Sequence, residues 1–218
     1  MDFIFSKEKE FDLHISNSIR GYDFLLSDII NISNYFIKDD SNVLDIGSST
    51  GKLLRYLHSE NNQASYTGIE PDKNFYIKSK SYTDNINYEN ISLCDFDWYD
   101  NQFDFITMIF TLQFINPNYK KEALEMIYAM LKEHGCFIIA EKIYFENSKI
   151  HNIMNSVFYQ NKLEKFSAAD ILEKEHSLRK MMTNNTSTEL TNMLKNAGFR
   201  HIEQIWQNFM FVGYMVIK

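Results

Sequence analysis

The apolar positions of residues 43–57 change their spacing at a single turn. Residues 43–46 form a short apolar run that stops at Gly47, after which Leu53, Leu54 and Leu57 recur at helical spacing. This change predicts a strand, a tight turn and the start of a helix. Glycine suits such a turn because it tolerates positive φ and lets a ligand approach the backbone. The segment is therefore predicted to be the first unit of an open α/β sheet.

Further apolar runs of strand length alternate with helical patterns along the chain. The runs cover residues 66–70, 90–93, 103–110 and 136–140. A helix is predicted to open at Asn116 and Pro117, to run through Leu131 and to stop at Gly135. Asp72 is predicted to cap the helix that follows the second strand. Alternation of this kind predicts a mostly parallel sheet.

The two ends of the chain and one long interval depart from this alternation. Residues 1–40 are predicted to form N-terminal helices, the first over 4–18. Residues 143–185 separate the fifth strand from the last core helix, and they predict a helical cap insertion because two amphipathic patterns lie within them. A capping box at residues 186–189 starts the last helix. Residues 201–206 and 208–218 then predict an antiparallel hairpin, since so short a link permits no other pairing.

Composition narrows the class of protein. The 218 residues carry a net charge of −7, which argues against direct nucleic-acid binding because such surfaces are normally basic. Cys94 and Cys136 fall in no metal-binding spacing, so no metal is predicted, and they are interpreted as thiols of a reducing compartment. No apolar run is long enough to cross a membrane, and the first residues are not a signal peptide. We therefore predict a single cytoplasmic domain over residues 1–218.

Acidic residues follow successive predicted strands at the edge where their carboxyl ends meet. Asp45 precedes Gly47 in the pattern Asp-x-Gly-x-x-x-Gly, which differs from the dinucleotide fingerprint. Glu70 lies 25 residues further on, where a carboxylate can accept hydrogen bonds from both ribose hydroxyls. Asp95 lies just past the third predicted strand. Together they predict a nucleoside-binding site, although a plain strand-to-helix turn would explain Asp45 and Gly47 alone.

This combination of elements resembles the class I S-adenosylmethionine (SAM)-dependent methyltransferases, which have a Rossmann-like, mostly parallel seven-stranded sheet with a C-terminal antiparallel hairpin. A closer likeness covers most of the chain. The residues that carry it are Gly21-Tyr22, the stretch 110–114 (FTLQF), Glu141-Lys142, Phe145-Glu146, Ala197-Gly198-Phe199 and the ending 206–218. In these stretches the chain is similar to the carboxy-S-adenosyl-L-methionine (carboxy-SAM) synthases, which make a cofactor used to modify the wobble uridine of tRNA.

The resemblance implies a set of residues around SAM. Glu70 would hold the ribose, Asp95 and Phe96 the adenine, and Gly47 would clear space for the amino-acid end while Tyr22 closes over it. The complete predicted cofactor site is Tyr22, Asp45, Gly47, Ser48, Gly51, Glu70, Pro71, Asp95, Phe96 and Ile109.

Two positions depart from the family pattern. Ile109 stands where the family has an asparagine, and Glu175 stands where it has the arginine that grips the extra carboxylate of carboxy-SAM. A glutamate there should repel a carboxylate, whereas an arginine would form a bidentate pair. Arg179 lies one helical turn later and could substitute only if the cap is displaced. These departures favour SAM over carboxy-SAM as the preferred ligand.

We therefore predict a SAM-dependent methyltransferase that acts on a small-molecule acceptor under the cap and releases S-adenosyl-L-homocysteine (SAH). The candidate catalytic residues are Tyr22, Glu141, Tyr144 and His176. Carboxy-SAM synthesis from SAM and prephenate is the first alternative. Intramolecular consumption of SAM and a non-catalytic SAM-binding subunit are the others. Apolar positions within the cap also predict a homodimer.

Overall fold

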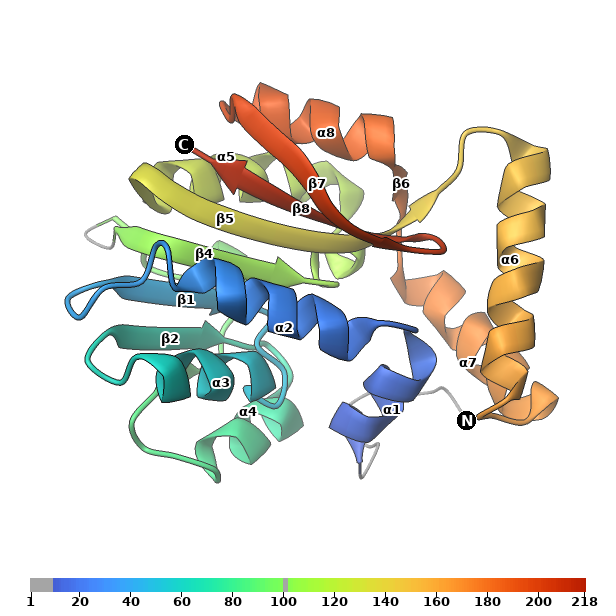
Figure 1. The fold of residues 1–218 in the computed structure, drawn as a ribbon, viewed down its shortest axis with the longest axis horizontal. Helices are drawn as coiled ribbons and strands as arrows, with labels where there is room; N and C mark the ends of the chain where they lie inside the picture. The colour runs from blue at the N-terminus through green and yellow to red at the C-terminus, as the bar shows by residue number, and fades with distance from the viewer. Residues whose placement is uncertain (1–9, 100–101) are drawn as a thin grey trace.

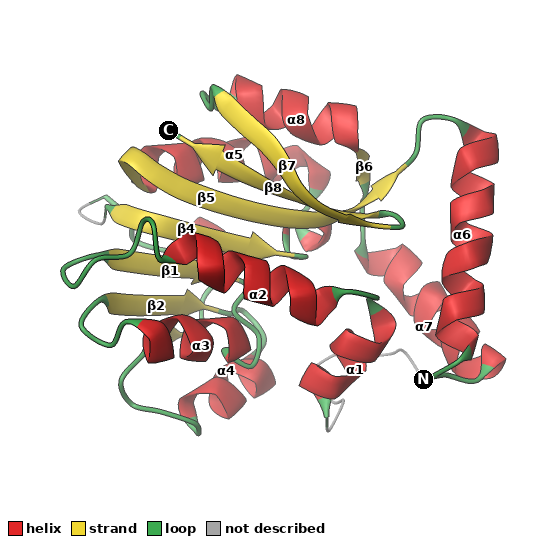
Figure 2. Ribbon diagram, viewed as in Figure 1, coloured by secondary structure: helices red, strands yellow, loops and turns green. Residues whose placement is uncertain are grey.

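A central sheet organises the computed structural model, which describes residues 10–99 and 102–218. The strand order is β3-β2-β1-β4-β5-β8-β7, and a short β6 pairs with β5 off this path. The strands are β1 (Asn42–Ile46), β2 (Ser65–Ile69), β3 (Asn87–Glu89), β4 (Phe103–Ile109), β5 (Leu131–Tyr144), β6 (Asn185–Thr186), β7 (His201–Asn208) and β8 (Phe211–Ile217). The arrows of Figure 2 show their arrangement.

Strand direction follows from the connections. Strands β1 to β5 are parallel to their neighbours, since a helix or long connection separates each pair along the chain. Strand β8 is antiparallel to β7, as the short hairpin link requires, and it is also antiparallel to β5. The predicted α/β fold with a C-terminal antiparallel hairpin is therefore confirmed.

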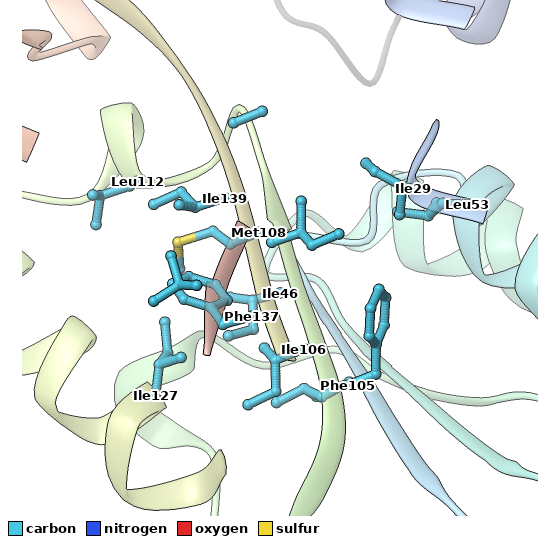
Figure 3. Packing of buried hydrophobic residues seen from close by; sticks show 14 of the residues in the cluster. Ile29, Ile46, Leu53, Phe105, Ile106, Met108, Leu112, Ile127, Phe137 and Ile139 are labelled. Carbon is cyan, nitrogen blue, oxygen red and sulfur yellow. The ribbon is translucent and has the colours of Figure 1, made fainter. Parts of the chain in front are cut away.

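Helices cover both faces of the sheet (Figure 1). One face carries α2 (Tyr22–Ser33), α3 (Lys52–Glu60) and α4 (Lys73–Lys80), and the other carries α5 (Lys120–Met130) and α8 (Ser187–Asn196). Side chains from both faces of the central strands are buried, and Figure 3 shows Phe105, Ile106 and Met108 of β4 among them. A strand buried on both faces needs a continuous apolar run, which is the pattern that predicted β4.

The cap stands beyond the carboxyl ends of the parallel strands (Figure 1). It contains α6 (Ser148–Leu163) and α7 (Ala168–Met181), and α1 (Phe11–Ser18) lies beside it. Asn147 and Ser167 cap α6 and α7 by accepting hydrogen bonds from backbone amides of the first turn. Both predicted caps outside this region, Asp72 of α4 and the Thr186–Glu189 box of α8, are also present.

Some predicted boundaries were wrong. The third strand is residues 87–89, and residues 93–95 instead form a 3-10 turn in which Leu93 is the buried residue. The helix after Pro117 ends at Met130, where Leu131 turns extended and joins β5, so Gly135 lies within the strand and does not stop the helix. Residues 4–9 of the first predicted helix lie outside the described residues.

The described residues contain no helix that is long and apolar enough to cross a membrane. Among residues 10–99 and 102–218 there is also no cluster of three histidine, cysteine or acidic side chains placed to hold a metal ion.

Candidate functional site

The sheet reverses its winding direction between β1 and β4. Because β1 has β2 on one side and β4 on the other, the connections leave in opposite directions and open a crevice at the carboxyl ends of the strands. A cavity of about 390 Å³ lies there and continues beneath the cap. The predicted residues that line it are Tyr22, Asp45, Gly47, Ser48, Glu70, Pro71 and Ile109.

Gly47 occupies a position that no other residue fits. Its φ is 74°, and a Cβ atom added there would lie 2.4 Å from Thr111 Oγ1. The Gly47 amide donates to the carbonyl of Ile69 at 2.9 Å. This hydrogen bond holds the turn after β1 against the end of β2. The missing side chain therefore lets the turn pass close to Thr111 at the end of β4 and leaves the cavity wall open at this point.

Asp45 is a buried carboxylate at the end of β1. The Thr107 hydroxyl of the neighbouring strand donates to its Oδ1 at 2.7 Å. Burial raises the pKa of Asp45 to about 7, the hydrogen bond from Thr107 partly opposes this, and the nearby carboxylate of Glu70 adds to it. Asp45 therefore exchanges a proton near neutral pH, and a cation in the cavity would favour its charged form.

Glu70 ties two turns together while it faces the cavity. Its Oε2 accepts from the Ser49 amide and its Oε1 from the Asp72 amide, both at 2.9 Å. Burial raises the pKa of Glu70, and these two hydrogen bonds oppose the rise. A carboxylate has about four acceptor positions, so two remain for a ligand that lies against it.

Two serines beside Glu70 show that this end of the cavity fits a polar ligand. The side-chain oxygens of Ser48 and Ser49 are buried and have no hydrogen-bond partner among the described residues. Both residues line the cavity. Because buried hydroxyl groups without partners are costly, a ligand with polar atoms at this point would satisfy them.

Aromatic side chains line the cavity between the strand ends and the cap. Phe110 follows β4 with φ at 56°, a conformation that costs about 1–3 kcal/mol for a residue other than glycine. Its ring lies 6.2 Å from the Tyr22 ring and packs edge-on against Phe211 at 5.5 Å. Burial raises the pKa of Tyr22, and the carboxylates of Asp12 and Asp45 add to the rise, so its hydroxyl stays protonated.

Three predicted cofactor residues do not line the cavity. A Cβ atom at Gly51 would lie 2.1 Å from the Tyr88 hydroxyl, so this glycine serves the packing of α3 on β3. Asp95 is exposed and accepts from the Ser92 hydroxyl at 2.6 Å. Phe96 is buried and packs against Phe103. The adenine contacts that the resemblance implies for Asp95 and Phe96 stay predictions.

Of the four candidate catalytic residues, the structure brings only Tyr22 to the cavity. Glu141 is buried on the other side of β5, where its Oε1 accepts from the Leu112 amide at 2.9 Å. Burial raises its pKa to about 8, and Lys120 opposes this rise. Tyr144 and His176 are exposed at the surface. Glu141 thus holds the loop after β4, and the geometry gives none of these three a place against a bound ligand.

Three basic residues at the cap end of the cavity were not predicted from the sequence. Lys142, Lys162 and Lys174 all line it, together with Glu175. They come from the end of β5 and from both cap helices, so no spacing pattern relates them. Lys142 lies close to the predicted end of the fifth strand, at residue 140. Nothing in the pattern indicated that its side chain enters the cavity.

Comparison with known proteins agrees with this geometry. The family profile of a methyltransferase domain matches residues 22–204. The carboxy-SAM synthase of Staphylococcus epidermidis is 32% identical over 214 residues, which is 96% of this chain and 92% of that protein. The carboxy-SAM synthase of Nautilia profundicola is 30% identical over 206 residues, 91% of this chain and 87% of the relative.

Solved structures share the fold at low sequence identity. The plantazolicin methyltransferase BpumL, in complex with a pentazolic desmethylPZN analog and SAH, superimposes with a TM-score of 0.72 at 14% identity, covering 98% of this chain and 93% of that one. Human N-acetylserotonin methyltransferase in complex with SAM gives 0.62 at 15% identity, over 98% of this chain and 55% of that one. The chain therefore belongs to the methyltransferase-domain family of SAM-dependent transferases and, within it, groups with the carboxy-SAM synthases.

Proposed function

We propose that the protein transfers the methyl group of SAM to a small acceptor that binds under the cap, and that it releases SAH. One observation carries the proposal: a single cavity joins the carboxylates at the ends of β1 and β2 to the apolar and basic side chains of the cap. A cavity of this volume and mixed lining is typical of a small-molecule site.

The residues at the strand ends fit SAM. Glu70 would accept hydrogen bonds from the ribose at its two remaining acceptor positions. Gly47 leaves room for the amino-acid end, and Asp45 would face the positive charge of the ligand. The unpartnered hydroxyls of Ser48 and Ser49 lie beside this path. SAM supplies an electrophilic methyl group on a positively charged sulfur.

The chain's own contribution is position and exclusion of water. The rings of Tyr22, Phe110 and Phe211 line the middle of the cavity, between the strand ends and the cap. An acceptor confined there would approach in line with the methyl group, and fixing that approach supplies much of the rate gain of a two-substrate reaction. The apolar rings would also keep water from competing with the acceptor.

Carboxy-SAM synthesis is the second candidate, because the similarity to carboxy-SAM synthases extends over 96% of the chain. Glu175, at the position expected to repel a carboxylate, has Lys162 at 3.6 Å and Lys142 at 3.9 Å. These neighbours neutralise it, so the repulsion that favoured SAM on sequence grounds has no counterpart in the charge around Glu175.

Mass spectrometry can separate the two candidates. Native spectra of protein purified without added ligand should show SAM or SAH as the bound mass. Incubation with SAM and prephenate should leave the mass of SAM unchanged if methyl transfer is correct. Carboxy-SAM, either co-purified or formed in that incubation, would instead establish the second candidate and overturn the first.

We also propose that the cap forms a homodimer. Ile150, Ile153 and Val157 lie on one side of α6 and expose 50%, 52% and 40% of their surface. Their spacing of three and four residues places them in one stripe, which a second copy of the helix would cover. Light scattering at micromolar concentration should give twice the mass of one chain.

A further inference from the structure

The short helix α1 forms one wall of the cavity. It lies between α4 and α7 (Figure 1), and two of its eight residues, Phe11 and Ser18, are buried. The residues of this segment that line the cavity are Phe11, Asp12, His14, Ile15, Ser18 and Ile19. A ligand at the strand ends would therefore lie against α1.

A side-chain hydrogen bond fastens α1 to the turn after β1. Thr50 Oγ1 donates to Asp12 Oδ1 at 2.6 Å. Thr50 is only 1% exposed and belongs to the turn of residues 47–51, whereas Asp12 is partly exposed. The helix is thus held by the same turn that lines the strand end of the cavity.

Arg55 of α3 contacts both partners of this hydrogen bond. Its Nη1 donates to the Thr50 carbonyl at 2.5 Å, and its Nη2 lies 3.9 Å from Asp12 Oδ2. The guanidinium carbon also lies 4.1 Å from the centre of the Tyr82 ring. A planar guanidinium fixed at several points holds its partners in a defined geometry, so Thr50 is kept in place for the bond to Asp12.

Ring contacts attach α1 on both of its sides. The Phe11 ring packs edge-on against Phe75 of α4 at 4.7 Å. The His14 ring lies 5.2 Å from the ring of Phe166, which precedes α7. These contacts are made by side chains, and such contacts can separate and re-form without unfolding the sheet.

The link between α1 and α2 has the geometry of a hinge. Ile19 is extended, with φ at −120° and ψ at 102°. Gly21 has φ at 81°, where residues other than glycine are strained. The chain therefore changes direction within three residues, at a point where glycine tolerates a further change of its backbone angles.

We propose that α1 is a lid on the SAM site, hinged at residues 19–21, and that the hydrogen bond from Thr50 to Asp12 is its latch. The inference rests on the proposed function only in placing SAM at the strand ends. With the latch closed, α1 encloses the ligand and excludes water; with the latch open, SAM enters and SAH leaves. Because the latch is part of the turn that faces the ligand, ligand binding and lid closure favour each other.

Hydrogen exchange tests the coupling between ligand and lid. Exchange of the amides of residues 11–18 in the full chain is followed by mass spectrometry with and without saturating SAH. We expect SAH to slow this exchange about tenfold in the natural chain and about threefold at most in Thr50→Val, which has a similar shape but no hydroxyl. Equal exchange with and without SAH in the natural chain would overturn the proposal.

The rate of SAH release separates a latch from two independent ligand contacts. Surface plasmon resonance on the full chain should show release about tenfold faster in Asp12→Ala and in Thr50→Val, as expected for the loss of one hydrogen bond to a charged group. The double variant should release SAH no faster than either single variant, because both substitutions remove the same bond. Effects that multiply in the double variant would mean that the two residues act separately, which contradicts a latch.

Conservative variants sharpen the assignment. Thr50→Ser restores the donor and Asp12→Asn keeps an acceptor oxygen, so both should release SAH within about threefold of the natural rate. Release from Asp12→Asn as fast as from Asp12→Ala would show that the charge retains the ligand, and would overturn the latch. Thr191→Val, which removes a hydroxyl bonded within α8, is the matched control. If Thr50→Val fails to fold by circular dichroism, Asp12→Ala at its partly exposed position still decides.

Failure of the lid and failure of the SAM site give different results. No binding of SAH to the natural chain would reject the placement of SAM at the strand ends, and the lid with it. Firm binding of SAH with the same release rate in Asp12→Ala, Thr50→Val and the natural chain would leave that placement standing and reject the lid alone.

Discussion

The two ends of the cavity differ in charge and in how the chain builds them. The strand end has Asp45, Glu70 and Asp72 against Lys52, whereas the cap end has three lysines against Glu175. Asp45 lies among the last residues of β1, and Glu70 and Asp72 directly follow β2. The lysines come from β5, α6 and α7, and α1 positions one of them. The strand end is thus encoded locally, and the cap end is encoded by tertiary contacts.

The largest effect is expected from removal of one basic residue. Lys162→Met removes the cation 3.6 Å from buried Glu175 and leaves Lys142 at 3.9 Å, and breaking a buried ion pair costs about 3 kcal/mol in the free energy of unfolding. The double variant Lys162→Met with Glu175→Leu should recover most of that loss, because no uncompensated charge remains. Urea denaturation measures both.

These variants test what the basic end is for. If the double variant is at least as stable as the natural chain, the charges are not needed for folding and a role in ligand binding is favoured. A single variant that loses less than about 1 kcal/mol would mean that water reaches Glu175 and that this end is less buried than the structure indicates. Lys149→Met serves as the exposed control.

At the acidic end, Glu70→Ala should weaken SAM binding about a hundredfold. Two hydrogen bonds to a charged group are worth about 3 kcal/mol together, and the turns at Ser49 and Asp72 also lose their acceptor. Calorimetry with SAM and SAH gives the affinities, and Glu60→Ala at the exposed end of α3 is the control. An unchanged affinity for both ligands in Glu70→Ala would contradict the placement of the ribose against this carboxylate.

The difference between the ends also explains what the sequence could predict. Asp45, Gly47 and Glu70 were found because strand tips of a parallel sheet meet at one edge, so spacing along the chain implies proximity in space. Asp72 and the Thr186–Glu189 box were found because a cap is a local hydrogen-bond pattern.

The cap end could not be predicted in the same way. The 3.6-residue period predicted α6 and α7, but it does not say which charged residues turn inward once those helices dock. Lys162 and Lys174 lie on different helices among other charged residues, and their burial depends on contacts with other elements such as α1. Glu141 was expected in the cavity and lies on the far side of β5, because alternate residues of a strand point to opposite faces.

A pH dependence is expected to separate the two ends further. The pKa of Asp45 is raised to about 7 in the folded chain, so a cationic ligand that favours the carboxylate must release a proton below that pH. The affinity for SAM should therefore fall as the pH decreases from 7, by up to about tenfold per unit. Calorimetry at pH 6 in two buffers of different ionisation enthalpy would detect the proton.

Asp45→Asn is the matching variant. It should flatten the pH dependence of SAM binding. A weaker dependence should remain because burial also raises the pKa of Glu70. The raised pKa of Asp45 also makes the free energy of unfolding depend on pH, and the direction is opposite to that for a carboxylate in an ordinary ion pair. Because the folded pKa lies above the unfolded value, the contribution of Asp45 is fully present below pH of about 4 and is lost as the pH rises to about 7. A natural chain with pH-independent SAM affinity between pH 5 and 8 would contradict this assignment.

The smallest effect on the folded chain is expected from a surface substitution on the cap. This substitution tests whether one chain alone provides the whole cavity. Ile153→Glu places a charge in the exposed stripe of α6, so the proposed dimer should dissociate to a single chain in light scattering at micromolar concentration. Ile77→Glu, at a position of similar exposure on α4, should leave the mass unchanged. The affinity for SAH should stay within about twofold in both variants if one chain is enough to complete the SAM site. A weaker affinity for SAH in Ile153→Glu alone would mean that the partner chain contributes to the cavity.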